Sequence, residues 1–472
     1  MRRFVLTIAI GVLCSSVAAA AAVDQLSSRL KQYDDETPSG RQVQVRTNSA
    51  TYPENVVTGD PAYPDPHWEM PSGCSGGGCS SGGCSGGSCS GGGCSGNGCA
   101  CGSCGCDDGG CDGSCGLPRN FYGRADYINW WVRGANTPAL VTTSPNGTPA
   151  GTAGLLPGAQ VLFGNDRVNA DGRPGGRFTL GYWLGDCENL AIEDTFFFLG
   201  SNTQSFGGSS DTTGVLARPF FNTVAGAQDV IYVALPGTSS GSITIDATSK
   251  MVGNEVNLRR CLYSDCCHRI DALAGYRYLL LSENLAINSN SMFTSSPPGS
   301  GIVVGTTVAA SDNFLTRNNF NGGQLGLVSE YYRGRWTLEL RGKIALGAVS
   351  QRVSINGSTD VNVPGGGTTQ SVGGLLALPS NIGNYNRNQF GALPEFNVNL
   401  HYQINPCWKV NVGYTIFALT NVVRPGDQID TRIDTNQIPP AQGTGPFTSP
   451  AFAFHNSDIL VQGINVGLVH EF

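Results

Sequence analysis

The segment WTLELRGKIAL (residues 336–346) decides the fold. Its apolar side chains fall mainly on even positions, from Trp336 to Leu346, and its polar and charged ones mainly on odd positions. Successive side chains of a β-strand point to opposite faces. This alternation therefore predicts a strand with one apolar face and one charged face.

The same alternation recurs from Phe121 to the end of the chain. Helix signals are weak, because no apolar stripe with helical spacing is sustained, and the 66 glycines favour turns over helices. We therefore expect an all-β fold, an antiparallel barrel of about ten strands, with twelve as the alternative count. The expected strands cover residues 121–132, 177–184, 190–199, 252–262, 271–287, 324–332, 336–346, 395–402, 408–416 and 460–472.

The connections between these strands alternate between long polar loops and short turns. Outer-membrane barrels have long extracellular loops, short periplasmic turns and an apolar face toward lipid. A soluble sandwich or barrel also alternates, but it turns the apolar face inward. The regular loop pattern favours the membrane barrel. Aromatic residues near strand ends are expected to form interface girdles: Trp130, Trp131, Trp183, Trp336 and Trp408.

The part ahead of the barrel divides into three segments. Residues 1–22 have a positive start, a short apolar core and a run of small residues, which predicts a signal peptide and export to the outer membrane. Residues 23–73 are polar and rich in proline, which predicts disorder. Residues 74–116 form a low-complexity Cys/Gly/Ser-rich segment, and the barrel is expected over residues 117–472.

Several phrases between the strands resemble the β-barrel porin family BBP7, which is found mainly in planctomycete genomes. They are RADYINWWVRGANTPALVTTSP (124–145), LARPFFN (216–222), GYRYLLLSENL (275–285), VGYTIFALTNVVRPGDQID (412–430) and QGINVGLVHEF (462–472). The resemblance covers about residues 121–472 and implies an outer-membrane barrel. It does not supply a transported solute.

The polar face of the strands carries charges of both signs, and in a membrane barrel this face lines the lumen. Two interpretations stay open: a pore whose lining biases ion flow, or a narrow barrel plugged by paired charges. The lumen-lining candidates are Arg124, Asp126, Arg177, Glu255, Arg259, Arg277, Glu330, Glu339, Arg341, Lys343, Glu395 and Lys409.

Two Arg-Pro motifs lie in expected loops, namely Arg218-Pro219 and Arg424-Pro425-Gly426-Asp427. The second is typical of a tight turn just beyond the membrane rim. One hypothesis is that the two arginines fold a loop inward as a constriction. The favoured hypothesis is that an ion pair of the arginine with Asp427 or Asp430 anchors the loop.

Sixteen cysteines remain after the expected signal peptide, and eleven of them lie in residues 74–116. The disulfide candidates outside that segment are Cys187, Cys261, Cys266, Cys267 and Cys407. All five fall at or near expected short turns, on the side where the barrel begins. We therefore expect disulfides between the Cys-rich segment and the underside of the barrel or neighbouring envelope proteins. Metal binding by Cys101, Cys104 and Cys106 is less favoured, and a redox role is weaker still.

Other functions are disfavoured. The net charge of −7 argues against a nucleic-acid partner, and no cofactor or metal is expected. The Gly-x-Ser-x-Gly match at residues 83–87 lies in a simple repeat, so we do not predict an enzyme. The expected partners are outer-membrane lipid and the barrel-assembly machinery, whose recognition signal the terminal Phe472 resembles.

Two functions follow from these patterns. The first is a porin for passive diffusion of small polar solutes or ions. The second is a structural envelope protein, in which a plugged barrel anchors a disulfide-cross-linked, Cys-rich arm. Adhesion through the long loops is a third possibility. The sequence does not predict the oligomeric state.

Overall fold

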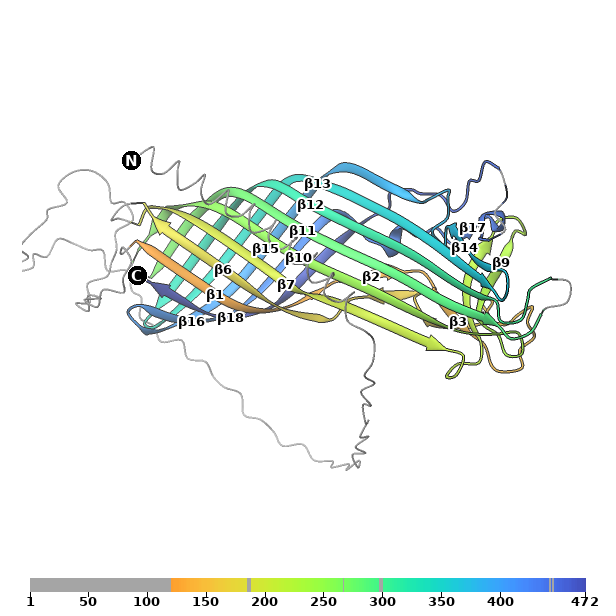
Figure 1. Cartoon of the computed structure of the whole chain (residues 1–472). Helices are drawn as coiled ribbons and strands as arrows, with labels where there is room; N and C mark the ends of the chain where they lie inside the picture. Colours follow the sequence, from red (N-terminus) through yellow and green to blue (C-terminus); the bar gives the residue numbers. More distant parts are fainter. Residues whose placement is uncertain (1–119, 185–187, 266, 297–299, 441–442, 444) are drawn as a thin grey trace, which may run out of the picture. The chain divides into compact units, whose positions relative to one another are not determined.

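The computed structural model of the chain describes residues 120–184, 188–265, 267–296, 300–440, 443 and 445–472 (Figure 1). The expected signal peptide, polar segment and Cys-rich segment lie outside the described residues. None of the helices in the described part of the chain is long and apolar enough to cross a membrane.

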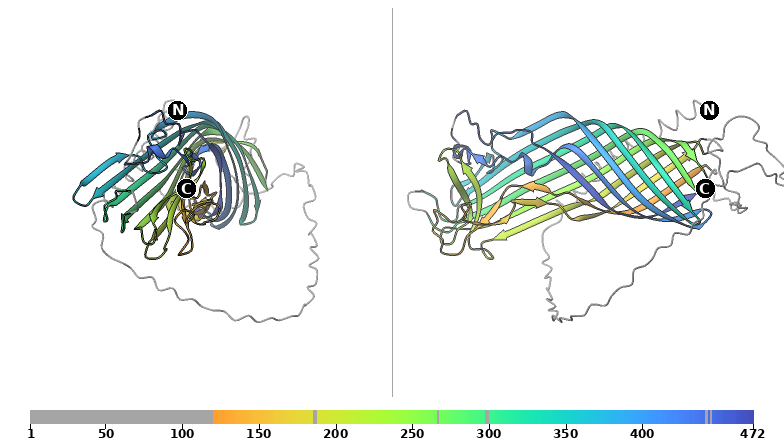
Figure 2. Two further views of the ribbon diagram at one scale, coloured as in Figure 1. Left: turned by 90° about the vertical axis from the view of Figure 1, so that its right-hand side faces the viewer. Right: turned by 180° about the vertical axis from the view of Figure 1, so that it is seen from behind.

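Ten antiparallel strands form a closed barrel, in which each strand pairs with the next and the last pairs with the first (Figures 1 and 2). This confirms the expected all-β membrane-barrel fold and the count of ten. The strands are β1 (Phe121–Val132), β6 (Gly172–Trp183), β7 (Leu190–Ser209), β10 (Ser239–Ser264), β11 (His268–Phe293), β12 (Thr307–Arg333), β13 (Trp336–Val363), β15 (Gly383–Asn405), β16 (Trp408–Val423) and β18 (Asn456–Glu471).

The two ends of the barrel differ. At one end, where β1 begins and β18 ends, the connections are short; the turn between β12 and β13 has two residues, Gly334 and Arg335. We call this the short-turn end and the opposite one the loop end. On the loop side the long connections build their own small elements (Figure 1). These are β2 (Ala135–Thr137), β3 (Val141–Thr143), β4 (Gln160–Phe163), β5 (Asp166–Val168), β8 (Leu216–Asn222), β9 (Ala227–Ala234), β14 (Gly367–Val372), β17 (Arg432–Ile433), η1 (Gly426–Gln428) and η2 (Thr435–Gln437). Of these, β2 lies nearer the middle of the barrel than β3 and β9 do (Figure 1).

Several barrel strands are much longer than the sequence pattern indicated. We expected a strand over residues 324–332, but β12 spans Thr307–Arg333, and β13 has 28 residues. A strand needs only about 9–11 residues to cross a membrane. The pattern missed the remainder because the apolar outward face ends partway along each strand.

In the short-turn half, the outward positions are apolar and exposed. Along β13, Trp336, Leu338, Leu340, Ile344 and Leu346 are all at least a third exposed. Adjacent strands continue this belt, with Leu325 and Leu327 on β12 and with Phe396 and Leu400 on β15. Such a surface is stable only against hydrocarbon.

Two of the five expected girdle tryptophans face the interior, so that part of the prediction was wrong. Trp131, Trp336 and Trp408 are exposed on the outer wall. Trp130 is 2% exposed and donates through Nε1 to Asn465 Oδ1 at 2.8 Å. The guanidinium carbon of Arg269 lies over the Trp183 ring, 4.6 Å from the centroid of that ring. Because adjacent strand residues face opposite sides, Trp130 and Trp131 cannot both meet lipid.

In the loop half, the alternation reverses. On β13 the inward residues Val349, Val353 and Ile355 are fully buried, whereas the outward Ser350 and Arg352 are exposed. Residues from the loops complete a buried core there, including Leu216 of β8 and Leu375 to Leu378. The loop half is therefore built like a water-soluble barrel, with water outside and hydrocarbon inside.

Candidate functional site

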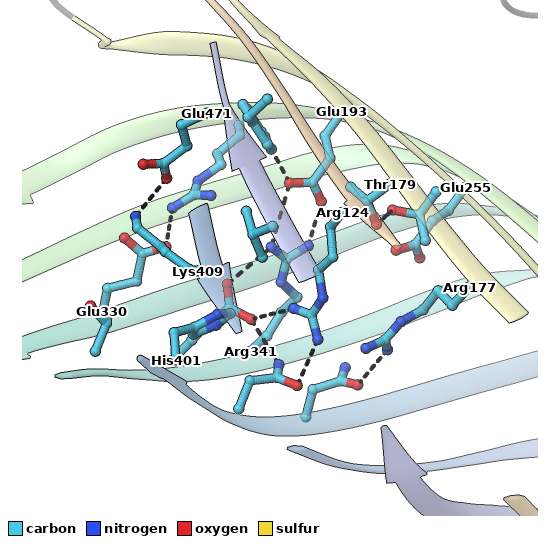
Figure 3. Close-up of a pocket in the computed structure, with 18 of the residues that line it drawn as sticks. Arg124, Arg177, Thr179, Glu193, Glu255, Glu330, Arg341, His401, Lys409 and Glu471 are labelled. Atoms are coloured by element: carbon cyan, nitrogen blue, oxygen red, sulfur yellow. Dashed lines mark hydrogen bonds and ion pairs between the residues drawn. The ribbon is translucent and has the colours of Figure 1, made fainter. Parts of the chain in front are cut away.

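A polar cavity of about 360 Å³ occupies the lumen of the short-turn half (Figure 3). Eleven of the twelve lumen-lining candidates line it, and the twelfth, Asp126, is buried among them. We call this cavity the charged chamber. Its rim toward the short-turn end includes Phe121, Glu188, Glu471 and Phe472.

Asp126 of β1 is held between two arginines. Its Oδ2 lies 2.8 Å from Nε of Arg124 and 2.9 Å from Nη2 of Arg177. Asn411 of β16 donates to its Oδ1 at 2.9 Å. The carboxylate therefore has charge-assisted partners on both oxygens, which is the condition for burying a charge at acceptable cost.

A second group joins four strands across the chamber. Lys343 of β13 lies 2.6 Å from Glu255 of β10 and 2.9 Å from Glu395 of β15. Arg277 of β11 pairs with the same two carboxylates. Each cation therefore bridges two carboxylates, and the four charges close a ring across the lumen.

A third group lies nearer the short-turn end. Arg341 pairs with Glu193 of β7 and with Glu339, 3.4 Å away on its own strand. Tyr122 donates to Glu193 at 2.9 Å. Figure 3 shows Arg341 and Arg124 side by side, with Glu193 between them and the wall.

The mouth of the chamber carries the remaining charges. Arg259 lies 2.5 Å from Asp271 and 2.7 Å from Glu330. Lys409 lies 2.6 Å from Glu471, which stands next to the terminal Phe472. The chamber thus holds cations and carboxylates in nearly equal number, with each charge compensated locally.

Several members of this network were not predicted from the sequence. Glu193, Arg269, Asp271 and His401 line the chamber or pair within it. Two of them could have been predicted. Arg269 and Asp271 stand an even number of residues from the inward Arg277 on the same strand, so their side chains face the same side. Glu193 was missed because phenylalanines on both faces of β7 obscure its alternation.

An apolar layer forms the ceiling of the chamber. Trp130 and Phe197 line the cavity from above, and their ring centroids are 5.1 Å apart. Phe417 packs edge-on against Trp130 at 5.6 Å. Nine of the ten strands contribute to this layer, and every member is at most 5% exposed: Ile128, Trp130, Val132, Phe197, Leu199, Met251, Leu279, Leu281, Phe320, Ala345, Val349, Leu393, Phe417, Leu419, Val422, Ile459 and Val461. We call it the apolar ceiling.

Above the ceiling, Arg424 ties the connection after β16 to the opposite wall. Its Nε and Nη2 lie 2.8 and 2.6 Å from the two oxygens of Glu283 on β11. Its Nη1 donates to the carbonyl of Arg133 at 2.6 Å. Burial alone would lower the pKa of Arg424, but the Glu283 carboxylate outweighs it and the pKa is raised.

Arg218 likewise connects β8 to the barrel wall through an ion pair. Its Nη2 lies 2.6 Å from Oδ2 of Asp312 on β12. The other oxygen of Asp312 accepts three backbone N–H bonds, from Leu375, Leu376 and Ala377, at 2.7 to 2.9 Å. One buried carboxylate therefore holds two separate connections at the loop end.

The favoured partners of the Arg-Pro loop were wrong. Arg424 pairs with Glu283 of the barrel wall, whereas Asp430 accepts from the backbone N–H groups of Arg432 and Ala451. Gly426 does not make a turn with positive φ. It opens η1, where a Cβ would lie 1.9 Å from the carbonyl oxygen of Asn136. Pro219 of the other Arg-Pro motif lies within β8. Burial raises the pKa of the Asp427 carboxyl group.

The cysteine candidates divide. Cys187 and Cys266 lie outside the described residues. Cys261 is disulfide-bonded, and Cys267 presents an exposed thiol in the turn between β10 and β11. Cys407 is half-buried in the turn before β16. The three described cysteines thus lie at or beside the short-turn end.

A closed ten-stranded antiparallel barrel with an apolar outer belt and a charged lumen defines the class of outer-membrane β-barrels. The chain belongs to the family described as Putative beta barrel porin-7 (BBP7), whose model matches residues 122–472. This confirms the resemblance that the sequence phrases indicated.

Comparisons with solved structures find outer-membrane barrels at low similarity. The outer membrane protease OmpT from Escherichia coli has 12% sequence identity and a TM-score of 0.35, covering 75% of this chain and 98% of that chain. The P. putida toluene transporter TodX has 9% identity and a TM-score of 0.20, covering 75% and 91%. At these scores neither carries an argument about activity. No curated protein matches the chain.

Proposed function

We propose that this protein is a plugged outer-membrane barrel that serves as a structural anchor in the envelope. The observation that carries the proposal is the apolar ceiling, a cluster of buried side chains from nine of the ten strands above the charged chamber. Its family is described as a porin family, which supports a membrane barrel without catalysis and, taken alone, favours the diffusion candidate considered below.

The ceiling opposes passage of ions and polar solutes. A charge that entered it would lose its water and meet only hydrocarbon, which costs many kcal/mol without a partner. Hydrophobic constrictions stop conduction in pores by excluding water. Above the ceiling, the Arg424–Glu283 and Arg218–Asp312 pairs fix further connections inside the loop half.

The anchoring role also rests on the positions of the thiols. The last cysteine of the Cys-rich segment is Cys115, six residues before β1 begins at the short-turn end. The exposed Cys267 lies at the same end. In outer-membrane barrels the short turns face the periplasm, which tolerates disulfides. The proposal is that the Cys-rich arm forms disulfides there with the barrel or with neighbouring envelope proteins.

Passive diffusion of small polar solutes is the second candidate. The charged chamber favours it, because a lining of both signs suits hydrated solutes. A continuous water path would require the ceiling to move. The packed tryptophan and phenylalanine rings oppose such a movement, so the geometry favours the anchor.

Planar-bilayer recording on the full chain separates the two candidates. We expect no stable conductance steps, with a known open porin recorded in parallel to establish that steps are detectable. Reproducible steps that persist after deletion of residues 74–116 would support diffusion and overturn the plugged barrel.

Non-reducing gels of isolated envelopes test the arm. We expect high-mass species that collapse on reduction and that disappear when residues 74–116 are deleted. Deletion of the equally long residues 31–73 is the matched control and should leave them in place. If both deletions behave alike, the Cys-rich arm is not the cross-linking element.

A further inference from the structure

A row of cationic side chains crosses the outer wall above the apolar belt. Lys250 of β10 and Arg352 of β13 are exposed, and Arg317 of β12 is half-exposed. Their neighbours along each strand, such as Met251 and Gln351, are buried inside. The three cations therefore share the outward face.

The strand register aligns these side chains. Lys250 stands opposite Ser282, Ser282 opposite Arg317, and Arg317 opposite Arg352. Asn386 of β15 continues the row beside Arg352. The strands β10 to β13 lie side by side along the barrel wall (Figure 1). Neighbouring strands are about 4.8 Å apart, so the cations spread over roughly 14 Å.

The surrounding outward positions are polar or apolar but never acidic. The adjacent row toward the loop end and the adjacent row toward the short-turn end contain no Asp or Glu on these five strands, all of which are described at these positions. The flanking residues are Thr248, Asn284, Leu315, Ser354 and Asn384 on one side and Val252, Leu280, Asn319, Ser350 and Asn388 on the other. The patch is therefore positive and rich in amide donors.

The position of the row along the strands places it beyond the apolar belt, on the loop side. On β13, Arg352 stands six positions beyond Leu346, the last large apolar residue of the belt. On β12, Arg317 stands eight positions beyond the 65% exposed Leu325. On β10 and β11 the outward Val252 and Leu280 stand next to the row on its short-turn side, so a lipid whose chains lie against these strands would bring its headgroup to the row.

We propose that the row binds the headgroup of a phosphate-bearing glycolipid in the leaflet at the loop end. Arginine and lysine form strong charge-assisted hydrogen bonds to phosphate oxygens. Three cations spread over several strands exceed what one phosphate can contact, so the site suits a headgroup with two phosphates. The asparagines around the row can donate to sugar hydroxyl groups.

The test uses the full chain in mixed detergent micelles, with diphosphoryl lipid A as the probe and native mass spectrometry as the readout. The variant is Lys250→Gln/Arg317→Gln/Arg352→Gln. The matched control is Arg260→Gln/Arg333→Gln/Arg335→Gln, which removes three exposed cations toward the short-turn end. Heat-modifiable gel mobility verifies folding of both.

We expect the wild type and the control to retain lipid A, and the variant to lose more than tenfold in retention. Phosphatidylglycerol should bind more weakly than lipid A, and excess inorganic phosphate should not displace the lipid. Equal loss in variant and control would overturn the site in favour of unspecific charge. Displacement by inorganic phosphate would overturn the lipid assignment, and equal binding of phosphatidylglycerol would overturn the two-phosphate headgroup.

Discussion

The two halves of this barrel use the same strands with opposite polarity. On β13, the short-turn half places leucine outside and Glu339, Arg341 and Lys343 inside. Ten residues further along, Ser350 and Arg352 face outward while Val353 and Ile355 are buried. The strand is continuous, and what changes along it is the surroundings of its outer face, which is lipid in the short-turn half and water in the loop half. The comparison shows that alternation predicts a strand but not which face is the inside.

The charged chamber and the loop-end core also differ in how they are filled. The chamber balances many charges against one another across all sides of the lumen. The loop-end core is hydrocarbon with isolated ion pairs, of which Arg424–Glu283 and Arg218–Asp312 are the clearest. Removing Glu283 should therefore have the largest effect, because the buried Arg424 and Arg173 both lose its carboxylate and only Asp427 remains to act on Arg424.

Replacing Glu283 by alanine should give the largest loss. The change removes the carboxylate that pairs with the buried Arg424 and acts on the buried Arg173, and it should lower the free energy of unfolding by about 3–5 kcal/mol. Urea titration in lipid vesicles, followed by tryptophan fluorescence, measures it. The double variant Glu283→Leu/Arg424→Leu should lose clearly less. Equal losses in the two would show that the ion pair itself, rather than the stranded charge, matters.

The second-largest expected effect comes from a charge on the outer face, which should destabilise the short-turn half but not the loop half. Leu340→Arg puts a cation into the lipid belt and should cost about 2–4 kcal/mol. Ser350→Arg, on the same face of the same strand, lies beyond the belt and should stay within about 0.5 kcal/mol. Vesicle unfolding titrations compare the two directly. Similar costs would mean that the belt does not end between these positions.

The adjacent tryptophans of β1 offer a smaller and sharper contrast. Trp130→Phe removes the donor to the buried Asn465 and should cost about 1–3 kcal/mol. Trp131→Phe on the lipid side removes no such bond and should cost less. The same titration applies, with excitation of the remaining tryptophans. A reversed order would contradict the inward placement of Trp130.

The smallest effect concerns an open turn, where water screens charge. Asp265 accepts from Tyr263 Oη and from the backbone N–H groups of Cys267 and His268, and these bonds lower its pKa to about 2. A depressed folded-state pKa stabilises the turn fully above about pH 4, the usual carboxyl range, and the contribution is lost as pH falls through about 2. The protection factors of the Cys267 and His268 amides, which are corrected for intrinsic exchange, should fall as the pH falls over this range in the wild type. Asp265→Asn should show no such pH step; a step retained there would assign it to another group.

The sequence predicted the short-turn half of the barrel far better than the loop half. Ten strands, the short turns and the inward charges such as Lys343 follow from a strong contrast between lipid-facing leucine and polar neighbours. The loop half was missed because asparagine, serine and threonine outside differ little in pattern from loop residues. Glu283 could have been found, since it shares the parity of Leu281 and Leu285, and a lone carboxylate in an apolar series requires a cation.

What alternation cannot supply is whether a lumen is open. The ceiling depends on Trp130, Phe197 and Phe417 meeting from β1, β7 and β16, which lie far apart in the sequence. Their parity places them inside, but the distance across the barrel decides whether they touch. That distance follows from the closed pairing of ten strands, not from any one segment.

The closure of the lumen can be measured along one strand with a small charged thiol reagent. In membrane-embedded protein, Lys343→Cys in the charged chamber and Val349→Cys in the ceiling are labelled from each side separately and mapped by peptide mass spectrometry. We predict that the cysteine at 343 reacts from the short-turn side alone and the one at 349 from neither side. Labelling at position 349 from both sides would reveal a continuous water path and contradict the plugged barrel.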